Sequence, residues 1–360
     1  MKSLMLAWSL IAICVAAGSG PASSIGHDEE IVFFPAFAAH DATNDLWEAE
    51  VEGWIYDPEQ RRAAHAVLDQ AIEHETTNLT ESQRAVFKER VFFFLTNHRR
   101  RESVAIRLGN KTYPLGQTRD DGRFSGRVRF NRGELDSQYS SDILPFQAVL
   151  AQGDSRVFSG EIHLINSTGV TVVCDIDDTI KISQVTNQHL LAKNMFCEPF
   201  RPVPGMNGLY RHLAHHESAE FWYVSASPWQ LFEPLSAFVR SNGYPNGIFC
   251  LRDFQGKHGS LRGFLRSAEK HQTGVIEPLM KKFPARQFVL IGNSGQRDPE
   301  IYAALAHKYP RQVESIYIRE VTTEAPGSPR YRRLANHLLG TKWVVFRSPV
   351  ELDGIASASY

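Results

Sequence analysis

The most constraining feature of the sequence is a short apolar run that ends in three carboxylates. Residues 170–174 are apolar or β-branched, and Asp175, Asp177 and Asp178 follow within four positions. This pattern predicts a buried strand of a parallel sheet. Like charges crowded at a strand end repel one another and cost stability. One interpretation is a solvated Asp-rich turn or an N-cap; the functional one is a site that holds a divalent cation against a phosphate.

Length and charge favour two domains and give no sign of a nucleic-acid partner. The chain has 360 residues, a formal net charge of -1 and 42% hydrophobic residues, which is ordinary for a globular protein. A balance this close to neutral provides no overall field to attract nucleic acid or an anionic membrane.

The N-terminus resembles an export signal. Lys2 precedes an apolar run from Leu4 to Ala17, and small residues follow, so we expect residues 1–22 to be a signal peptide and the mature protein to be periplasmic or secreted. The mature chain keeps three cysteines, an odd number that excludes a disulfide framework. Cys197 and Cys250 are the candidates for a single bridge, and Cys174 is expected to be an inert core thiol.

Residues 28–165 are predicted to form a small β-sandwich interrupted by a helical hairpin at 57–96. In the hairpin, Asp57-Pro58 is expected to start one helix, and Thr80 with Gln83 forms a capping box for the next. Residues 104–108, Gly109-Asn110 and a return through Tyr113 indicate a β-hairpin. The other expected strands alternate apolar and polar residues or are mostly apolar, at 47–56, 124–130, 146–150 and 157–165.

Residues 166–350 change to strands alternating with helices, which indicates a parallel sheet covered on both faces. The carboxyl ends of such strands lie along one edge, where ligands bind. Strands are expected at 170–174, 220–225, 287–291, 313–318 and 342–346, and helices near 206–215, 229–241, 275–282, 299–308 and 329–338. Pro234 and Pro278 predict kinks or altered boundaries in two of these helices.

Asp175 and Asp177 are two residues apart on an extended segment, so their side chains project the same way. We expect Asp175 to be the nucleophile that forms an aspartyl-phosphate, and Asp177 to be the general acid and base, with a pKa raised by its neighbours. Mg²⁺ would be held by the Asp175 carboxylate and the Asp177 main-chain carbonyl. Asp178 and Thr179 are expected to fix the following turn.

Two later strand ends complete the predicted site. The strand 221–225 ends in a hydroxyl, and Ser227-Pro228 is expected to cap a helix, so Ser225, Ala226 and Ser227 are candidates for binding a phosphoryl group. Each of these features alone is also typical of a plain strand-to-helix turn. After the strand 288–291, oxygen ligands from Asn293 and Asp298 would complete the metal site.

These motifs resemble the haloacid dehalogenase superfamily of aspartate-nucleophile phosphatases and, more narrowly, the actin-patch-type phosphatidate phosphatase catalytic domain in an exported, bacterial-like form. The resemblance covers about residues 165–345 and implies a Rossmann-like α/β phosphatase fold, Mg²⁺ and conversion of phosphatidate to diacylglycerol. It rests on 175–181, Pro204-Gly205-Met206, Leu209-Tyr210, 223–231, 251–254 and 292–302.

The chain departs from the pattern of that family at two positions. The family usually has aspartate where this chain has Asn293, and an amide ligand should bind Mg²⁺ less tightly. It also usually has lysine where this chain has Gln272, after His271. That lysine would steady the nucleophile and the phosphoryl charge; Lys270 is the candidate to replace it, and Lys257 is a more remote one.

The predicted function is a Mg²⁺-dependent phosphatase acting on a phosphorylated small molecule or phospholipid, with peripheral membrane contact as a further expectation. Asn293 and Gln272 motivate an alternative, a catalytically weakened relative that binds phosphorylated ligands or a partner. A phosphatase for water-soluble or protein-borne phosphates is a third interpretation, because the sequence has no obvious amphipathic membrane helix.

Overall fold

The computed structural model of the chain describes residues 25–58, 79–95, 97–135, 141–216, 218–253, 268–336 and 338–352. The predicted signal peptide, the first helix of the predicted insertion and Lys257 lie outside these ranges. The contacts between residues divide the described chain into two compact units. Residues 79–90 and 168–352 form the first unit, and residues 25–58 and 91–167 form the second.

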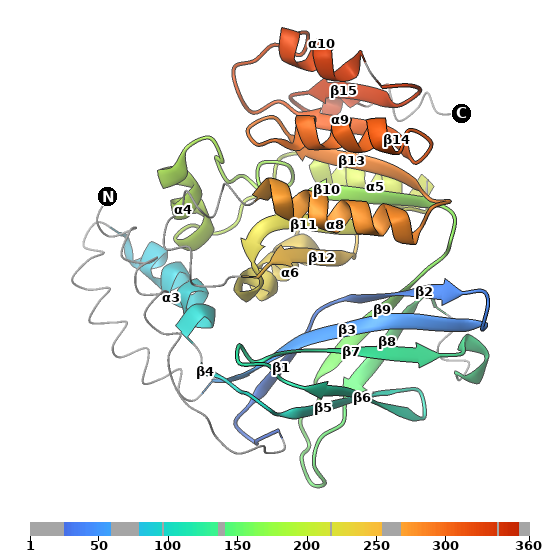
Figure 1. The fold of residues 1–360 in the computed structure, drawn as a ribbon. Helices are drawn as coiled ribbons and strands as arrows, with labels where there is room; N and C mark the ends of the chain where they lie inside the picture. Colours follow the sequence, from blue (N-terminus) through green and yellow to red (C-terminus); the bar gives the residue numbers. More distant parts are fainter. Residues whose placement is uncertain are drawn as a thin grey trace. The chain divides into compact units, whose positions relative to one another are not determined.

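A six-stranded sheet runs through the first unit, and every neighbouring pair of its strands is parallel (Figure 1). The strands follow the order β12-β11-β10-β13-β14-β15. Five of them lie where the sequence predicts strands, and the short β12 is not among the predicted strands. The bounds are β10 (Val170–Asp175), β11 (Glu220–Pro228), β12 (Ile248–Arg252), β13 (Gln287–Asn293), β14 (Val313–Arg319) and β15 (Lys342–Phe346).

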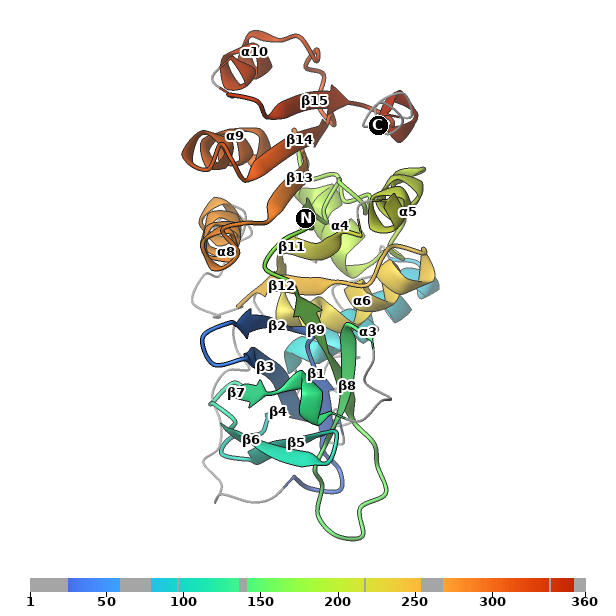
Figure 2. The same ribbon diagram turned by 90° about the vertical axis from the view of Figure 1, so that its right-hand side faces the viewer.

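Helices cover both faces of this sheet. Figure 2 shows α8, α9 and α10 on one face and α5 and α6 on the other. The direction of winding therefore reverses between β10 and β13, and the carboxyl ends of strands at such a switch point are where open α/β sheets bind ligands. The helices are α4 (Gln188–Phe196), α5 (Met206–His216), α6 (Phe232–Ser241), α8 (Ala268–Lys282), α9 (Asp298–Lys308) and α10 (Pro329–Ala335).

Differences from the predicted helices have local causes. Pro234 falls in the first turn of α6, where a missing N–H costs little, and α8 begins before the predicted boundary and contains Pro278. Helix α4 is not among the predicted helices. Its first turn is capped by Asn187, whose side chain accepts hydrogen bonds from the backbone of His189 and Leu190.

Within the described residues, no helix is both long and apolar enough to cross a bilayer.

The second unit is built on a nine-stranded sheet with the path β1-β3-β2-β9-β8-β5-β6, to which β4 and β7 add by pairing with β3. The pairing of β2 with β9 is parallel, and the other pairs are antiparallel. These pairings join all nine strands into one hydrogen-bonded network, and they do not show whether this network folds into two facing sheets. The β-sandwich therefore stays a prediction. The strands are β1 (Glu30–Phe33), β2 (Ala36–Asp41), β3 (Leu46–Asp57), β4 (Asn97–His98), β5 (Ser103–Leu108), β6 (Lys111–Gln117), β7 (Arg123–Phe130), β8 (Ile143–Ala148) and β9 (Ser159–Ile165).

Two local predictions are confirmed. The hairpin of β5 and β6 closes through Gly109 and Asn110, with Leu108 paired to Lys111 and Gly109 at φ 61, as a two-residue turn requires. The capping box at the start of α3 (Glu81–Leu95) has both of its hydrogen bonds: Thr80 N donates to Gln83 Oε1 at 3.0 Å, and Gln83 N donates to Thr80 Oγ1 at 3.2 Å.

The candidate bridge between Cys197 and Cys250 is not formed, because neither residue takes part in a disulfide. Cys197 follows the last turn of α4, whereas Cys250 lies within β12, and β-sheet geometry fixes its position there. Cys174 lies fully buried in β10, and burial raises its pKa well above the ordinary value. A thiol in this state is not a nucleophile, as expected for Cys174.

Candidate active site

Asp175 is the last residue of β10 and lies at the switch point of the parallel sheet. Its side chain is buried, and its Oδ2 accepts hydrogen bonds from Thr179 Oγ1 at 2.9 Å and from Asn293 Nδ2 at 3.0 Å. Burial, together with the charges of Asp298 and Asp177, raises the pKa of Asp175 well above its usual range. Asp175 is therefore a carboxyl group that is costly to ionise, even though two donors form hydrogen bonds with it.

Asp177 is held by four side chains. Lys181 Nζ lies 2.7 Å from Oδ1, and Ser183 Oγ donates to the same oxygen at 2.7 Å. Ser225 Oγ donates to Oδ2 at 2.9 Å, and Ser227 Oγ does so at 3.4 Å. Burial acts to raise the pKa of Asp177, but the charge of Lys181 and these hydrogen bonds outweigh it and lower the pKa. The expectation of a raised pKa is therefore wrong, because it left out the buried cation.

Lys181 is the site residue that the sequence interpretation missed. It is 1% exposed, pairs with Asp177, donates to Ser183 Oγ and lies with Nζ 4.8 Å from the centre of the Phe200 ring. A lysine is almost never fully buried unless it is paired. The available signal was a lysine set between Ile180 and Ile182, four residues after an acidic residue.

Asp178 holds the loop that follows the site. Its carboxylate accepts hydrogen bonds from the backbone N–H groups of Ser183, Gln184 and Val185, at 2.6 to 2.9 Å. The residue itself lies at φ 57, in the left-handed region that aspartate tolerates better than most residues. Asp178 thus fixes the turn, as expected, whereas the hydroxyl of Thr179 is used on Asp175 instead.

The segment after β11 differs from its prediction. Ser227 does not cap a helix: β11 extends to Pro228, a 3₁₀ turn covers Trp229–Leu231, and α6 begins only at Phe232. The backbone N–H of Ser227 donates to Ser225 Oγ at 2.9 Å, and both hydroxyls reach Asp177. Ser225 and Ser227 are buried and Ala226 is half-buried. The structure therefore brings Ser225 and Ser227 to Asp177, where they organise the carboxylate.

Asn293 ends β13, and Asp298 begins α9. Asn293 Nδ2 donates to Asp175 Oδ2 and to the main-chain oxygen of Asp177 at 2.9 Å. The backbone N–H of Asn293 donates to Asp298 Oδ2 at 2.8 Å. A Cβ at Gly292 would collide with the side chain of Asp298, so only glycine permits this close approach. Burial raises the pKa of Asp298, and these hydrogen bonds oppose the rise.

The structure does not bring Lys270 into this cluster. Lys270 lies in the first turn of α8 with an exposed side chain. Gln272, from the same helix, is buried and donates from Nε2 to Asp298 Oδ1 at 2.8 Å. The buried cation next to the acidic residues is Lys181, from the loop after β10.

The predicted metal ligands fit a divalent cation only in part. The carboxylate of Asp175 and the main-chain oxygen of Asp177 are oxygen donors close enough to share one hydrogen-bonding partner. Asn293, however, turns its nitrogen toward them, and both oxygens of Asp298 accept N–H groups of the chain itself. Among the residues that the structure describes, no group of three or more His, Cys, Asp or Glu side chains is arranged to hold a metal ion.

Comparison with known proteins supports a phosphatase. Residues 170–320 match the family model described as the catalytic domain of the phosphatidate phosphatase APP1. Phosphatidate phosphatase APP1 of Saccharomyces cerevisiae is 27% identical over 262 residues, which cover 70% of this chain and 43% of the yeast protein. The matches support a hydrolase of the phosphatase class and, for the matched segment, the phosphatidate phosphatase catalytic-domain family.

Other similarities add less. An uncharacterized protein of Schizosaccharomyces pombe is 28% identical over 191 residues, covering 50% of this chain and 31% of that protein. The chain thus spans less than half the length of either of these relatives. Among solved structures, a Parabacteroides merdae beta-glucuronidase has a TM-score of 0.27 and 10% identity, covering 81% of this chain and 34% of that chain. A score at this level does not establish a shared fold.

Proposed function

We propose that this protein hydrolyses a phosphomonoester through Asp175, and that its substrate is a phosphatidate-like lipid that yields diacylglycerol and phosphate. The observation that carries the proposal is the pair Asp175 and Asp177, buried together with Lys181 and two serine hydroxyls at a strand switch point. The family match over the same segment supports the choice of reaction.

In the proposed reaction, an Asp175 carboxylate oxygen attacks phosphorus, and the bond from phosphorus to the alcohol oxygen breaks. Asp177 gives a proton to the leaving alkoxide. Water then attacks the aspartyl-phosphate, Asp177 takes the proton of that water, and phosphate leaves with the Asp175 carboxylate restored. Because Lys181 lowers the pKa of Asp177, the resting site favours its base form. Asp175, whose pKa is raised, holds a proton more tightly than Asp177 does. The reaction therefore requires this proton to pass from Asp175 to Asp177 when the substrate binds, which ionises the nucleophile and readies the acid.

Mg²⁺ is the proposed cofactor, with the Asp175 carboxylate and the Asp177 carbonyl as the residues that would hold it. When bound, it would supply positive charge that offsets the repulsion between an anionic substrate and the acidic residues. We also propose that the fold is of the haloacid dehalogenase type, a proposal to which the strand order of the parallel sheet lends support. An exported location remains a proposal that rests on the sequence of residues 1–22.

The test is Asp175→Asn, assayed for phosphate release with and without Mg²⁺. The substrate panel includes phosphatidic acid in mixed micelles, a sugar phosphate and a nucleotide. We expect loss of phosphate release with an unchanged circular dichroism spectrum. Asp142→Asn makes the same chemical change at an exposed ion pair with Arg132 and should retain full activity. Unchanged activity of Asp175→Asn would rule out the mechanism.

A second function, binding of phosphorylated ligands without efficient turnover, is favoured by the amides of Asn293 and Gln272 in the cluster. The assay that separates the two functions is phosphate release by the wild type beside Asn293→Asp. An inactive wild type that the aspartate revives would favour the binding function, whereas an active wild type would exclude it.

A further inference from the structure

The side-chain amide of Asn293 has a fixed orientation. Its Oδ1 accepts hydrogen bonds from the backbone N–H groups of Gly295 at 2.9 Å and Gln296 at 3.2 Å. Its Nδ2 donates to Asp175 Oδ2 and to the main-chain oxygen of Asp177. A reversed amide would set oxygen against two acceptors and nitrogen against two donors. All four contacts therefore specify the same orientation, and the side chain is completely buried.

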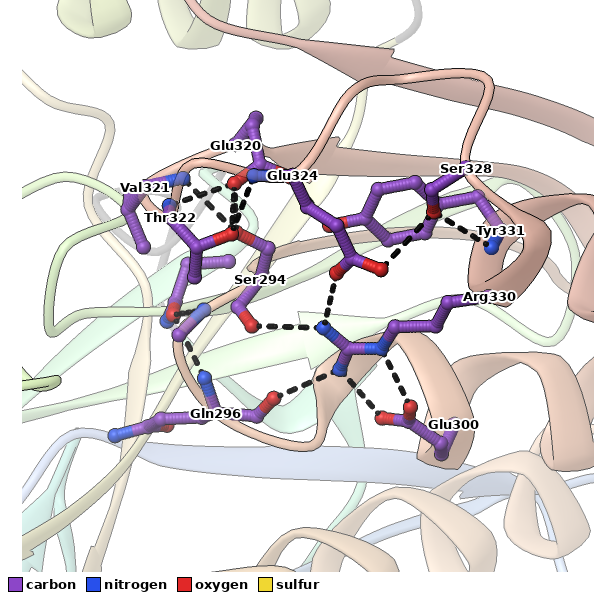
Figure 3. A network of polar contacts seen from close by, with 12 residues as sticks. Ser294, Gln296, Glu300, Glu320, Val321, Thr322, Glu324, Ser328, Arg330 and Tyr331 are labelled. Carbon is purple, nitrogen blue, oxygen red and sulfur yellow. Dashed lines mark hydrogen bonds and ion pairs between the residues drawn. The ribbon is translucent and has the colours of Figure 1, made fainter.

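A polar network holds the turn that supplies these two N–H groups (Figure 3). Arg330, from α10, donates to the main-chain oxygens of Ser294 at 3.2 Å and Gln296 at 3.4 Å. Its guanidinium forms a bidentate ion pair with Glu300: Nε donates to Oε1 at 2.8 Å, and Nη2 donates to Oε2 at 3.0 Å. Because planar pairs of this kind fix geometry as well as charge, Arg330 stabilises the backbone on which the amide of Asn293 rests.

The other end of the same turn is held by the segment that follows β14. Ser294 Oγ donates to Glu320 Oε1 at 2.9 Å and accepts the backbone N–H of Val321 at 2.9 Å. Glu320 also accepts a hydrogen bond from the Tyr331 hydroxyl, as Figure 3 shows in part. The turn after β13 is thus fixed on both sides by side chains that do not touch Asp175 themselves.

We propose that Asn293 is a positioning residue whose amide nitrogen occupies the point where the oxygens of Asp175 and Asp177 converge, so that divalent cations bind this site weakly. A cation bound to those two oxygens has to displace the nitrogen. Turning the amide to offer its oxygen breaks both hydrogen bonds to the turn. The inference goes beyond the proposed function and concerns cation affinity, which can be measured whether or not the protein releases phosphate.

Asn293→Asp should reverse this property. A carboxylate can keep one oxygen on the N–H groups of the turn and present the other to a cation beside Asp175. It also adds a fourth acidic residue to a buried cluster of Asp175, Asp177 and Asp298 whose cation is Lys181. The variant should therefore gain more stability from Mg²⁺ than the wild type does, because a bound cation offsets the added charge.

The experiment is Mg²⁺ titration of the full chain by calorimetry, with thermal unfolding measured in EDTA and in excess Mg²⁺. We expect Asn293→Asp to bind Mg²⁺ at least tenfold more tightly than the wild type and to show the larger rise in Tm on adding Mg²⁺. Asn207→Asp is the matched control: Asn207 donates to the main-chain oxygen of Asn242, so the same added charge there should leave Mg²⁺ affinity unchanged. Equal affinities of the wild type and Asn293→Asp would overturn the proposal.

A second measurement uses only the wild type and holds even where Asn293→Asp fails to fold. In a crystal soaked in excess MgCl₂, Asn293 should keep its Oδ1 on the N–H groups of Gly295 and Gln296, with no metal ion at bonding distance from this oxygen. A Mg²⁺ ion about 2.1 Å from Asn293 Oδ1 would overturn the proposal. Because neither readout is phosphate release, failure of the proposed enzyme function would not affect the role assigned to Asn293.

Discussion

The two units differ in how completely they bury an ion pair. In the second unit the pair of Arg129 with Glu48 has 59% and 33% of the two side chains exposed, and Arg99 stays 35% exposed where it pairs with the buried Glu29. In the first unit, the pair of Lys181 with Asp177 has side chains 1% and 6% exposed. Burying both partners of an ion pair is expensive, so a fold that needs only stability avoids it. The difference therefore marks the end of β10 as a place shaped by chemistry rather than by packing.

The comparison makes its largest prediction for Lys181. Lys181→Met leaves Asp177 buried without its cation, and breaking a buried pair in this way costs about 3–5 kcal/mol. Arg129→Met removes a surface pair and should cost about 0–1 kcal/mol. Urea denaturation of the two variants measures both values. A similar cost for both would break the distinction between the units.

The double variant Lys181→Met with Asp177→Asn sharpens that result. Removing both charges eliminates the unpaired carboxylate, so the double variant should be more stable than Lys181→Met alone. Its phosphate release should still be absent, because Asp177 is the proposed acid and base. Recovery of stability without recovery of activity would separate the structural cost of the ion pair from its chemical use.

Gly292→Ala tests how tightly the acid cluster is packed. The added methyl group meets the side chain of Asp298, and overpacking of this kind typically costs about 1–3 kcal/mol. Gly208→Ala, in α5, is the matched control, because an added Cβ there meets nothing within 4 Å. That change should stabilise the helix by about 0.5–1 kcal/mol. Equal free energies of unfolding for both variants would show that the loop after β13 moves to accommodate the added methyl group at little cost.

Local signals in the sequence are sufficient for the parallel sheet and the first carboxylates. The apolar run 170–174 predicts β10, and because parallel strands end at one edge, Asp175, Ser225 and Asn293 can be expected together. The capping box at Thr80 and the Gly109-Asn110 turn can also be predicted from the sequence, since each depends on residues that lie close together in the chain.

The features that could not be predicted depend on contacts between distant residues or on burial. Nothing local distinguishes a lysine that folds back onto Asp177 from an exposed one, so the sequence interpretation favours Lys270 and overlooks Lys181. The orientation of the Asn293 amide likewise depends on a turn held by Arg330, 37 positions away in the chain. The predicted direction of the Asp177 pKa shift is wrong for the same reason: the neighbouring acidic residues are visible in the sequence, and the buried cation is not.

The pH dependence of stability gives a further comparison. The pKa of Asp175 is raised in the folded protein, so the folded state holds this proton more tightly than the unfolded chain does. As pH rises above about 3.9, the ordinary pKa of aspartate, the unfolded chain ionises first and the folded state loses stability. In EDTA, Asp175→Asn should therefore gain stability relative to the wild type as pH rises from about 4.

Asp142→Asn is the control for this pH series, because Asp142 forms an exposed pair with Arg132. Its stability difference from the wild type should stay nearly constant between acidic and neutral pH. Urea midpoints at several pH values measure both series. A flat difference for Asp175→Asn would mean that the buried carboxyl is no harder to ionise than a surface one.

The smallest expected effect concerns the start of α3, where the chemistry is local and exposed. Thr80→Ala removes the hydroxyl that accepts the backbone N–H of Gln83, and loss of such a cap costs about 1 kcal/mol. Thr80→Ser keeps the hydroxyl and should stay within a few tenths of a kcal/mol of the wild type. Urea denaturation of the two variants is the measurement. A cost for Thr80→Ala as large as that of Lys181→Met would mean that burial does not set the scale of these polar contacts, because the first is exposed and the second is not.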